Sequence, residues 1–519
     1  MLRSEYTNLS VVDIREGLNA GNFSAKEIAD ASLSCIDALD AGVVDAFLST
    51  TPMLAYEAAE KLDTNSAKSA QVKAGILAGV PIAFKDNMNL MGTHTTCASK
   101  MLADYISPYT ATCVAKTLAA GAIPMGKLNM DEFAFGSSTE TSAFKLTRNP
   151  WDLERVPGGS SGGSVAAVAS GMVTVALGSD TGGSIRQPAA FCGVVGFKPT
   201  YGVVSRYGVV AFGSSLDQVG PIGRSVADVA ITTDAICGRD PLDCTSQDVN
   251  PGYYNSVLAA QQKGIKGMKI GVVPEYLEAP GIEREVVKAL KGAIANLQEL
   301  GAQIVDVSLP NAQAALAAYY VIGPCEAFSN LSRFDSVRYG NKNDVVQTAA
   351  TDLGSRYEQA RAHGFGPEAI RRIMLGSYLL SSGVYNTYYY PAQQVRTLIT
   401  KDYQQAFEQV DVILAPVSPR TAFKFGEVGD PTSMYLSDIF TIPINIAGNG
   451  GLSLPVGLGE DSGLPVAVQI IGPQFGDYAI MRAAAALEQC YPDIRRIAPL
   501  MDSLNASANG LKSPERGVA

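Results

Sequence analysis

Two serines and one lysine, each in a glycine-rich or apolar segment, are the residues of this chain best suited to chemistry. Lys85 ends the apolar run GVPIAFK, Ser160 lies in PGGSSGGS, and Ser184 lies in GSDTGGSIRQPAA. A serine becomes a nucleophile when a base takes its proton and fixed donors stabilise the oxyanion that forms. The chain contains only two histidines, so we expect lysine rather than histidine to supply the base.

The loop Thr181-Gly182-Gly183-Ser184 is suited to binding an oxyanion. Its two glycines allow consecutive backbone N–H groups to converge on one point, since no Cβ blocks the turn. The second loop, GGSSGG at 158–163, is separated from the first by one predicted helix and one predicted strand, which can bring both loops to one edge of a sheet. Considered alone, the first loop could equally be a tight turn with a solvated serine, and the second a flexible loop or an anion cradle. The second loop does not fit the P-loop pattern.

Lys85 needs an unusual environment to act as a base. At an ordinary pKa of about 10.4, only about 0.04% of a lysine is neutral at pH 7. Burial lowers the pKa of a lysine by up to several units, and the preceding VPIAF run is apolar enough to bury it. The alternative is a structural lysine paired with the adjacent Asp86.

A rival pattern places the nucleophile one residue later. The segment 159–163 fits GxSxG, the nucleophile elbow of α/β-hydrolases, with Ser161 as the nucleophile. That fold needs a strand before the elbow and a histidine further on. WDLERVP at 151–157 does not have a strand pattern, and only His363 follows, in polar surroundings. We therefore keep the elbow only as an alternative.

Alternating helices and strands are expected to position these residues. A capping box, Ser24–Glu27, predicts a helix through about Leu39. Further helices are expected at 53–62, 110–120, 164–170, 283–300 and 477–490, and strands at 80–84, 122–126, 173–177, 268–273, 303–307, 412–415 and 466–471. This alternation predicts an α/β fold with helices on the faces of a sheet. Residues 238–266 are expected to form a long polar connection, and 500–519 a polar, disordered tail.

The composition is that of an ordinary globular protein. The 519 residues are 47% hydrophobic and carry a net charge of −10, which argues against binding nucleic acid by charge alone. The eight cysteines contain no CxxC pattern, which is typical of reduced thiols. No apolar run has the length of a membrane span, and the N-terminus lacks a signal-peptide pattern. We therefore expect a cytoplasmic protein that does not bind a membrane.

Taken together, these motifs resemble the amidase signature family. GGSSGGS, GSDTGGSIRQPA with its serine twenty-four residues after Ser160, GFKPTYG at 196–202 and the upstream PIAFKDN agree in order and spacing. The resemblance covers about residues 5–495 and implies one large α/β domain with a central mixed sheet covered by helices on both faces. The strand–helix–strand unit at 268–307 suggests in addition that about 240–400 form an inserted lobe, which would bear substrate contacts.

The resemblance implies a Ser-cisSer-Lys triad. Ser184 is then the nucleophile and Ser160 the bridging serine, in a cis peptide bond with Gly159. Lys85 is then the base, which draws the Ser184 proton through Ser160. Backbone N–H groups of the loop would form the oxyanion hole, with Thr181, Gly182 and Gly183 as its main members.

Four further stretches, at 129–144, 149–163, 371–378 and 434–448, resemble the glutaminase subunits of tRNA-dependent amidotransferases. This implies hydrolysis of glutamine or asparagine through an acyl-enzyme. The ammonia would serve an ATP-dependent ligase that converts Glu-tRNA(Gln) into Gln-tRNA(Gln). Similarity assigns Arg372 to the α-carboxylate and Asp438 to the α-ammonium group of the amino acid, with Tyr319 beside them. Tyr320 and Arg371 are the neighbouring alternatives.

The same resemblance implies a heterotrimer with the B and C subunits of the amidotransferase, in which charged tRNA is bound mainly through the B subunit. ATP and magnesium are expected in the partner subunit, and this chain is expected to bind no cofactor or metal directly. Two other functions stay open. One is a stand-alone amidase of the same family that acts on small amides and does not depend on Arg372 and Asp438. The other is a catalytically idle scaffold subunit.

Overall fold

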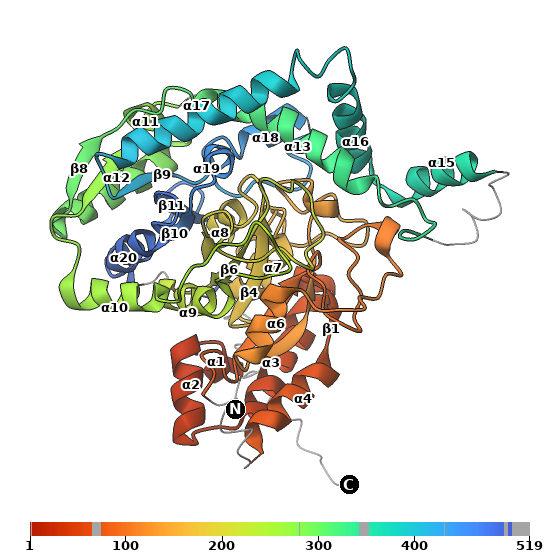
Figure 1. Cartoon of the computed structure of the whole chain (residues 1–519). Coiled ribbons are helices and arrows are strands. Elements are labelled where there is room, and N and C mark those ends of the chain that lie inside the picture. The colour runs from red at the N-terminus through yellow and green to blue at the C-terminus, as the bar shows by residue number, and fades with distance from the viewer. Residues whose placement is uncertain are drawn as a thin grey trace, which may run out of the picture.

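A computed structural model describes residues 1, 3–64, 74–279, 281–341, 352–429, 431–492 and 497–500. The described strands form one mixed sheet of eleven strands that runs through the molecule (Figure 1). In spatial order these are β1 (Phe47–Thr50), β3 (Ile123–Leu128), β2 (Pro81–Lys85), β4 (Val175–Asp180), β6 (Gln218–Gly223), β5 (Val195–Lys198), β10 (Gly451–Leu458), β11 (Pro465–Ile471), β9 (Val412–Pro416), β7 (Lys269–Val272) and β8 (Gln303–Asp306).

Two parallel pairings bring the candidate catalytic residues to one edge of this sheet. β2 lies between β3 and β4 and runs parallel to both, with Phe84 opposite Leu177. The carboxyl ends of parallel strands meet at the same edge, where open α/β sheets place their ligands. Lys85, which ends β2, therefore lies beside the loop that follows Asp180 at the end of β4.

Helices cover both faces of the sheet. In β9, Val412 and Leu414 belong to one hydrophobic core, whereas Ile413 and Ala415 belong to the other. The first core takes side chains from α1 (Arg3–Tyr6), α2 (Val11–Ala20), α3 (Ala25–Leu39), α4 (Pro52–Asp63), α6 (Thr112–Ala119), α7 (Gly162–Ala169), α8 (Arg186–Cys192), α9 (Val226–Ile236), α10 (Tyr253–Lys263), α12 (Arg284–Glu299) and α20 (Asp477–Glu488). The second takes them from α13 (Ala315–Leu331), α16 (Pro367–Leu379), α17 (Tyr389–Phe407) and α19 (Ile442–Ala447). This confirms the predicted fold class.

Three further α-helices are short or peripheral: α11 (Pro274–Leu277), α15 (Leu353–Gly364) and α18 (Pro431–Leu436). Among the described helices, none combines the length and the hydropathy that a membrane crossing requires. The segment 240–400 contributes β7 and β8 to the common sheet through the pairing of β7 with β9. The expected disordered tail lies outside the described residues, except for Leu500.

The prediction of a long polar connection at 238–266 is wrong in its second half, which forms α10. The buried residues Tyr253, Val257 and Ala260 follow one face of that helix. These three buried residues are enough to stabilise the helix because α10 packs against α9 and α20. Tyr254, Leu258 and Ala259 are also apolar but only half-buried, so the sequence does not show which face is buried.

Candidate active site

Lys85 is fully buried, and its ammonium group faces the GGSSGG loop. Its Nζ lies 2.7 Å from Ser160 Oγ, 3.0 Å from Ser161 Oγ and 3.2 Å from the carbonyl oxygen of Ser179. The peptide bond between Gly159 and Ser160 is cis, as the family resemblance implied. The alternative of a lysine paired with Asp86 is wrong, because the partner of Asp86 is the buried Lys127, at 2.8 Å.

Burial lowers the pKa of Lys85 to about 7. Three buried carboxylates, Asp131, Asp180 and Asp217, oppose this effect and favour the charged form. At neutral pH a substantial fraction of Lys85 is therefore neutral and can accept a proton, which an ordinary lysine cannot do.

The Ser184 backbone carbonyl accepts a hydrogen bond from the Ser161 N–H at 3.1 Å, which ties the two serine loops together. Of the three serines, Ser184 alone is not fully buried, with 8% of its surface exposed. Within the described part of the chain, the Ser184 hydroxyl makes no hydrogen bond to Ser160 or Lys85. The predicted contact between Lys85 and Ser160 is thus present, whereas the predicted hydrogen bond between Ser160 and Ser184 is not present among the described residues.

The loop after β4 leaves three N–H groups for an oxyanion. Gly183 has a φ of +140°, and its N–H already donates to Asp180 Oδ1 at 2.8 Å. The N–H groups of Thr181, Gly182 and Ser184 donate to no group among the described residues. Buried N–H groups are rarely left without an acceptor, so these three are the better candidates for the oxyanion hole. The N–H of Gly183 instead fixes the shape of the loop.

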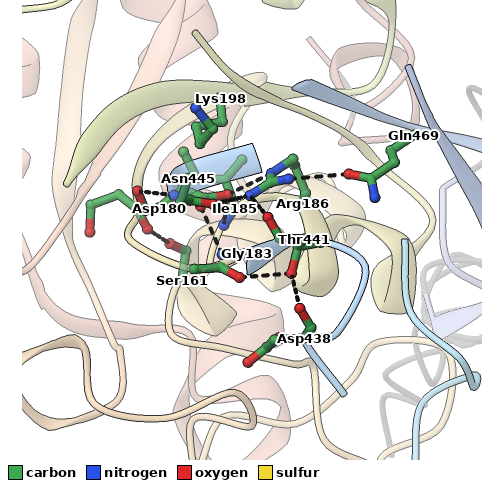
Figure 2. Close-up of polar contacts among 12 residues, drawn as sticks. Ser161, Asp180, Gly183, Ile185, Arg186, Lys198, Asp438, Thr441, Asn445 and Gln469 are labelled. Atoms are coloured by element: carbon green, nitrogen blue, oxygen red, sulfur yellow. Dashed lines mark hydrogen bonds and ion pairs between the residues drawn. The ribbon is translucent and has the colours of Figure 1, made fainter. Parts of the chain in front are cut away.

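A buried network behind the loop holds it in place (Figure 2). The guanidinium of Arg186 pairs with both carboxylate oxygens of Asp180, at 3.0 and 3.1 Å. Arg186 also donates to Gln469 and to Asn445, which in turn donates to Asp180 Oδ1 at 2.9 Å. Burial raises the pKa of Asp180, but Arg186, together with Lys198 and Asn445, outweighs burial and holds that pKa at about 2. The carboxylate therefore stays ionised beneath the loop.

The GGSSGG loop fits tightly against a second buried carboxylate. A Cβ on Gly159 would lie 2.1 Å from Asp131 Oδ2, so only glycine fits there. Asp131 accepts hydrogen bonds from the Thr139 N–H at 2.9 Å and the Thr141 hydroxyl at 2.9 Å. Burial raises the pKa of Asp131 to about 6. Asp180 lies within GSDTGGSIRQPAA and Asp131 within the stretch 129–144, but neither pattern shows that these carboxylates are buried beneath the two loops.

Asp438 lies beside the nucleophile loop. The Ser137 hydroxyl donates to Asp438 Oδ2, whereas Oδ1 is buried and has no partner among the described residues. A Cβ on Gly183 would come within 3.4 Å of that unpaired oxygen. Burial raises the pKa of Asp438 to about 7. A buried carboxylate oxygen without a donor is poised to accept one from a cationic ligand.

Arg372 lies on α16, and its side chain is only 5% exposed, whereas that of Arg371 is 51% exposed. Its guanidinium carbon lies 5.3–5.7 Å from the ring centroids of four aromatic residues: Phe135, Phe212, Tyr320 and Tyr435. Burial lowers the pKa of Arg372, but Tyr320, Tyr319 and Glu368 outweigh burial and raise it, so the side chain stays charged.

The two neighbouring tyrosines lie in different places. The phenol ring of Tyr319 abuts the nucleophile loop, where a Cβ on Gly182 would lie 3.0 Å from its hydroxyl. Tyr320 instead stacks on Tyr435 at 3.8 Å and faces Arg372.

A cavity of about 760 Å³ opens beside these residues and is lined by Phe135, Ser137, Glu368, Arg372 and Tyr435, among others. Neither Lys85 nor Ser184 lines it, so the cavity lies to one side of these two residues. The elbow alternative finds no support, since Ser161 is fully buried and both histidines are exposed. The described residues contain no cluster of three or more His, Cys, Asp or Glu side chains that could hold a metal ion.

Comparisons with known proteins agree with this geometry. A profile of the family described as Amidase matches residues 27–481. The chain is 53% identical over 482 residues to the A subunit of the glutamyl-tRNA(Gln) amidotransferase of Moorella thermoacetica. This match covers 93% of this chain and 96% of that protein. The crystal structure of the same-named subunit from Thermotoga maritima matches with a TM-score of 0.73 and 43% identity, over 95% of each chain. The native peptide amidase of Stenotrophomonas maltophilia matches with a TM-score of 0.77 and 28% identity, over 94% of this chain and 98% of that one.

Proposed function

The chain belongs to the amidase family, and we propose that within it the chain is the glutamine-hydrolysing subunit of a tRNA-dependent amidotransferase. The observation that carries the proposal is a carboxylate beside the nucleophile loop together with a cation at the neighbouring cavity. Asp438 Oδ1 is buried without a partner in the described part of the chain, and Arg372 is a buried cation at the cavity. A free amino acid carries one charge of each sign, so this pair suits glutamine or asparagine better than a simple amide. The identity to subunits of that name points the same way.

The chemistry proceeds through an acyl-enzyme on Ser184. Neutral Lys85 takes the proton of Ser160, which takes the proton of Ser184, and Ser184 Oγ attacks the side-chain carboxamide carbon. The oxyanion binds the N–H groups of the loop. The carbon–nitrogen bond breaks as the same chain returns a proton to the leaving nitrogen, which departs as ammonia. Water then attacks the ester, and Ser184 is restored with release of glutamate.

One link must form during this reaction. The Ser184 and Ser160 hydroxyls share no hydrogen bond in the described part of the chain, and catalytic hydrogen bonds commonly tighten only when substrate binds. Ser184 is the end of the relay with solvent access, and Lys85 already holds Ser160 at 2.7 Å. The relay is complete once the Ser184 hydroxyl donates to Ser160 Oγ.

The remaining parts of the proposal concern the complex. The B and C subunits complete a cytoplasmic heterotrimer, and charged tRNA is bound mainly through the B subunit. The B subunit also uses ATP and magnesium to activate Glu-tRNA(Gln), which the ammonia then converts into Gln-tRNA(Gln). The name shared by the relatives supports an assembly of several subunits.

The test is ammonia release by the chain purified with its co-purifying subunits. We expect release from glutamine, and its loss in Ser184→Ala although that variant stays folded. We also expect ATP-dependent formation of Gln-tRNA(Gln) when Glu-tRNA(Gln) is added. Cleavage of simple amides without cleavage of glutamine would instead establish a stand-alone amidase. A folded wild-type complex that releases no ammonia from any amide would favour the idle scaffold.

A further inference from the structure

Glu368 holds the substrate-facing arginine from one side. Its Oε1 accepts a hydrogen bond from Arg372 Nε at 2.8 Å and another from the Tyr435 hydroxyl at 3.2 Å. Its Oε2 contacts Arg371 Nη1. The Glu368 side chain is only 13% exposed and lines the same cavity as Arg372. One carboxylate therefore organises three donors at the start of α16.

The guanidinium of Arg372 has little freedom to turn out of its plane. The rings of Phe135, Phe212, Tyr320 and Tyr435 surround it, and Nε is fixed by Glu368. The two terminal nitrogens, Nη1 and Nη2, donate to no other side chain or carbonyl in the described ranges. A guanidinium has five N–H donors, so four of them are left to face the cavity.

A carboxylate can pair with a guanidinium along two different edges. It takes either the end edge, formed by Nη1 and Nη2, or the side edge, formed by Nε and one Nη. In this chain Glu368 already occupies Nε, so the side edge is closed to a second carboxylate. Only the end edge remains, and it lies in a plane that the aromatic rings define.

We propose that Glu368 is a positioning residue that selects the amino-acid substrate through Arg372. By holding Nε, it directs the Nη1–Nη2 edge to the α-carboxylate and fixes where the substrate's α-carbon lies relative to Ser184. The proposal rests on the function given above to Arg372, and it adds the residue that sets the orientation of this contact.

A competing role for Glu368 makes the opposite prediction. If Glu368 were chiefly a counter-ion that competes with the substrate for Arg372, removal of its charge would strengthen carboxylate binding and lower KM. If it positions Arg372, loss of the acceptor would weaken binding, whereas loss of the charge alone would matter little. Glutamine at this position keeps an oxygen acceptor without the charge, and aspartate keeps the charge but is one methylene too short to reach Nε.

The experiment compares Glu368→Ala, Glu368→Gln and Glu368→Asp in the purified complex. The substrates are glutamine and 4-aminobutanamide, which is glutamine without its α-carboxylate; where the latter turns over slowly, its inhibition constant against glutamine replaces KM. We expect Glu368→Ala and Glu368→Asp to raise KM for glutamine about tenfold or more, the loss typical of one hydrogen bond to a charged group, with kcat within about twofold. We expect Glu368→Gln to stay within about threefold of wild type.

Comparison with 4-aminobutanamide separates a loss of Arg372 positioning from general damage to the active site. All three variants should bind 4-aminobutanamide as the wild type does, because it makes no contact with Arg372. Met374→Ala is the matched control, since Met374 lies on the same helix but is largely exposed and does not line the cavity, and its KM should not change. If Glu368→Ala does not fold, the contrast between Glu368→Gln and Glu368→Asp still decides the matter.

Three outcomes would overturn the proposal. They are a lower KM for glutamine in Glu368→Ala, an unchanged KM in both Glu368→Ala and Glu368→Asp, or an equal loss with both substrates. In each of these the wild type is still active on glutamine, so the proposed function stands. Wild-type complex that releases no ammonia from glutamine would instead remove the proposed function itself, and this role with it.

Discussion

At the scale of single residues, Lys85 is held by two hydroxyls and one carbonyl oxygen and has no carboxylate within ion-pair distance among the described residues. That environment favours the neutral amine, which is the form a base requires. We expect Lys85→Ala to lower kcat about 10²–10⁴-fold, the usual contribution of a general base. Lys85→Arg should be as damaging, because a guanidinium does not deprotonate in proteins.

Ser161→Ala is the matched control for this prediction. It removes one of the three acceptors of Lys85 but leaves Ser160 Oγ and the Ser179 carbonyl in place, so kcat should fall only a few-fold. Steady-state ammonia release measures all three variants. A Ser161 variant more impaired than Lys85→Ala would return the nucleophile to the elbow alternative.

The pH dependence follows from two buried groups whose pKa values lie near 7. Burial lowers the pKa of Lys85 to about 7 and raises that of Asp438 to about 7. Both must lose a proton to act, Lys85 to become a base and Asp438 to hold the α-ammonium group. Activity is therefore lost as pH falls through about 7. Below that pH, log kcat/KM for glutamine should rise with a slope approaching about 2, one for each group.

The quantity kcat/KM reports the ionisation of groups on the free enzyme. An amide without an ammonium group, such as butanamide, therefore separates the effect of Lys85 ionisation from that of Asp438 ionisation. It should show a slope of about 1, because only Lys85 then matters, and Asp438→Asn should reduce the glutamine slope to about 1 as well. A single-proton slope for both substrates in the wild type would remove Asp438 from substrate binding.

Motifs allow some site residues to be predicted but not the residues that hold them. Lys85, Ser160 and Ser184 can be named because they lie in short glycine-rich or apolar segments whose pattern is local. The partners of Arg186, namely Asn445 and Gln469, are 259 and 283 positions away along the chain. Glu368 is not predicted for a different reason, because a glutamate on a helix surface is usually solvated and its partner Tyr435 comes from another element.

At the scale of elements, the loop between β4 and α8 depends on the ion pair of Asp180 with Arg186. Both side chains are fully buried, and Arg186 joins the loop to α19 and to β11. We expect Arg186→Met to lower the free energy of unfolding by about 3–5 kcal/mol, because it leaves the Asp180 carboxylate buried without its partner. Urea denaturation at neutral pH measures the loss.

The double variant Asp180→Asn/Arg186→Met should recover part of this stability, since no unpaired charge then remains in the core. The exposed pair Lys26–Asp30 is the control, and Lys26→Ala should leave the denaturation midpoint unchanged. Equal stability of Arg186→Met and wild type would show that the pair is not what holds the loop.

Most elements are predictable to within a few residues where a cap or an uninterrupted apolar run marks the boundary. The capping box at Ser24 and Glu27 is present, and α3 ends at Leu39 as expected. β2 can be placed because an uninterrupted apolar run precedes Lys85. The α10 helix is not predicted because its apolar face is narrow, and packing against α9 and α20 rather than its own propensity stabilises it.

At the scale of the whole molecule, one sheet carries two hydrophobic cores, and the segment 240–400 shares that sheet. We therefore expect one cooperative unfolding transition rather than separate melting of an inserted lobe. Fluorescence of Trp151, the only tryptophan, and far-ultraviolet circular dichroism should give coincident denaturation curves.

Leu414 and Ile413 lie on opposite faces of β9. We expect Leu414→Ala and Ile413→Ala each to lower the free energy of unfolding by about 2–5 kcal/mol within that single transition. A transition seen by circular dichroism and absent from the Trp151 signal would show that the lobe unfolds independently.

The central claim is that Ser184 carries the acyl group. The most direct measurement is mass spectrometry of the complex quenched in acid during glutamine turnover, followed by proteolysis. We predict a γ-glutamyl ester on the peptide that contains Ser184, which disappears in Ser184→Ala. The same adduct on the peptide that contains Ser161, or turnover of glutamine by Ser184→Ala, would contradict it.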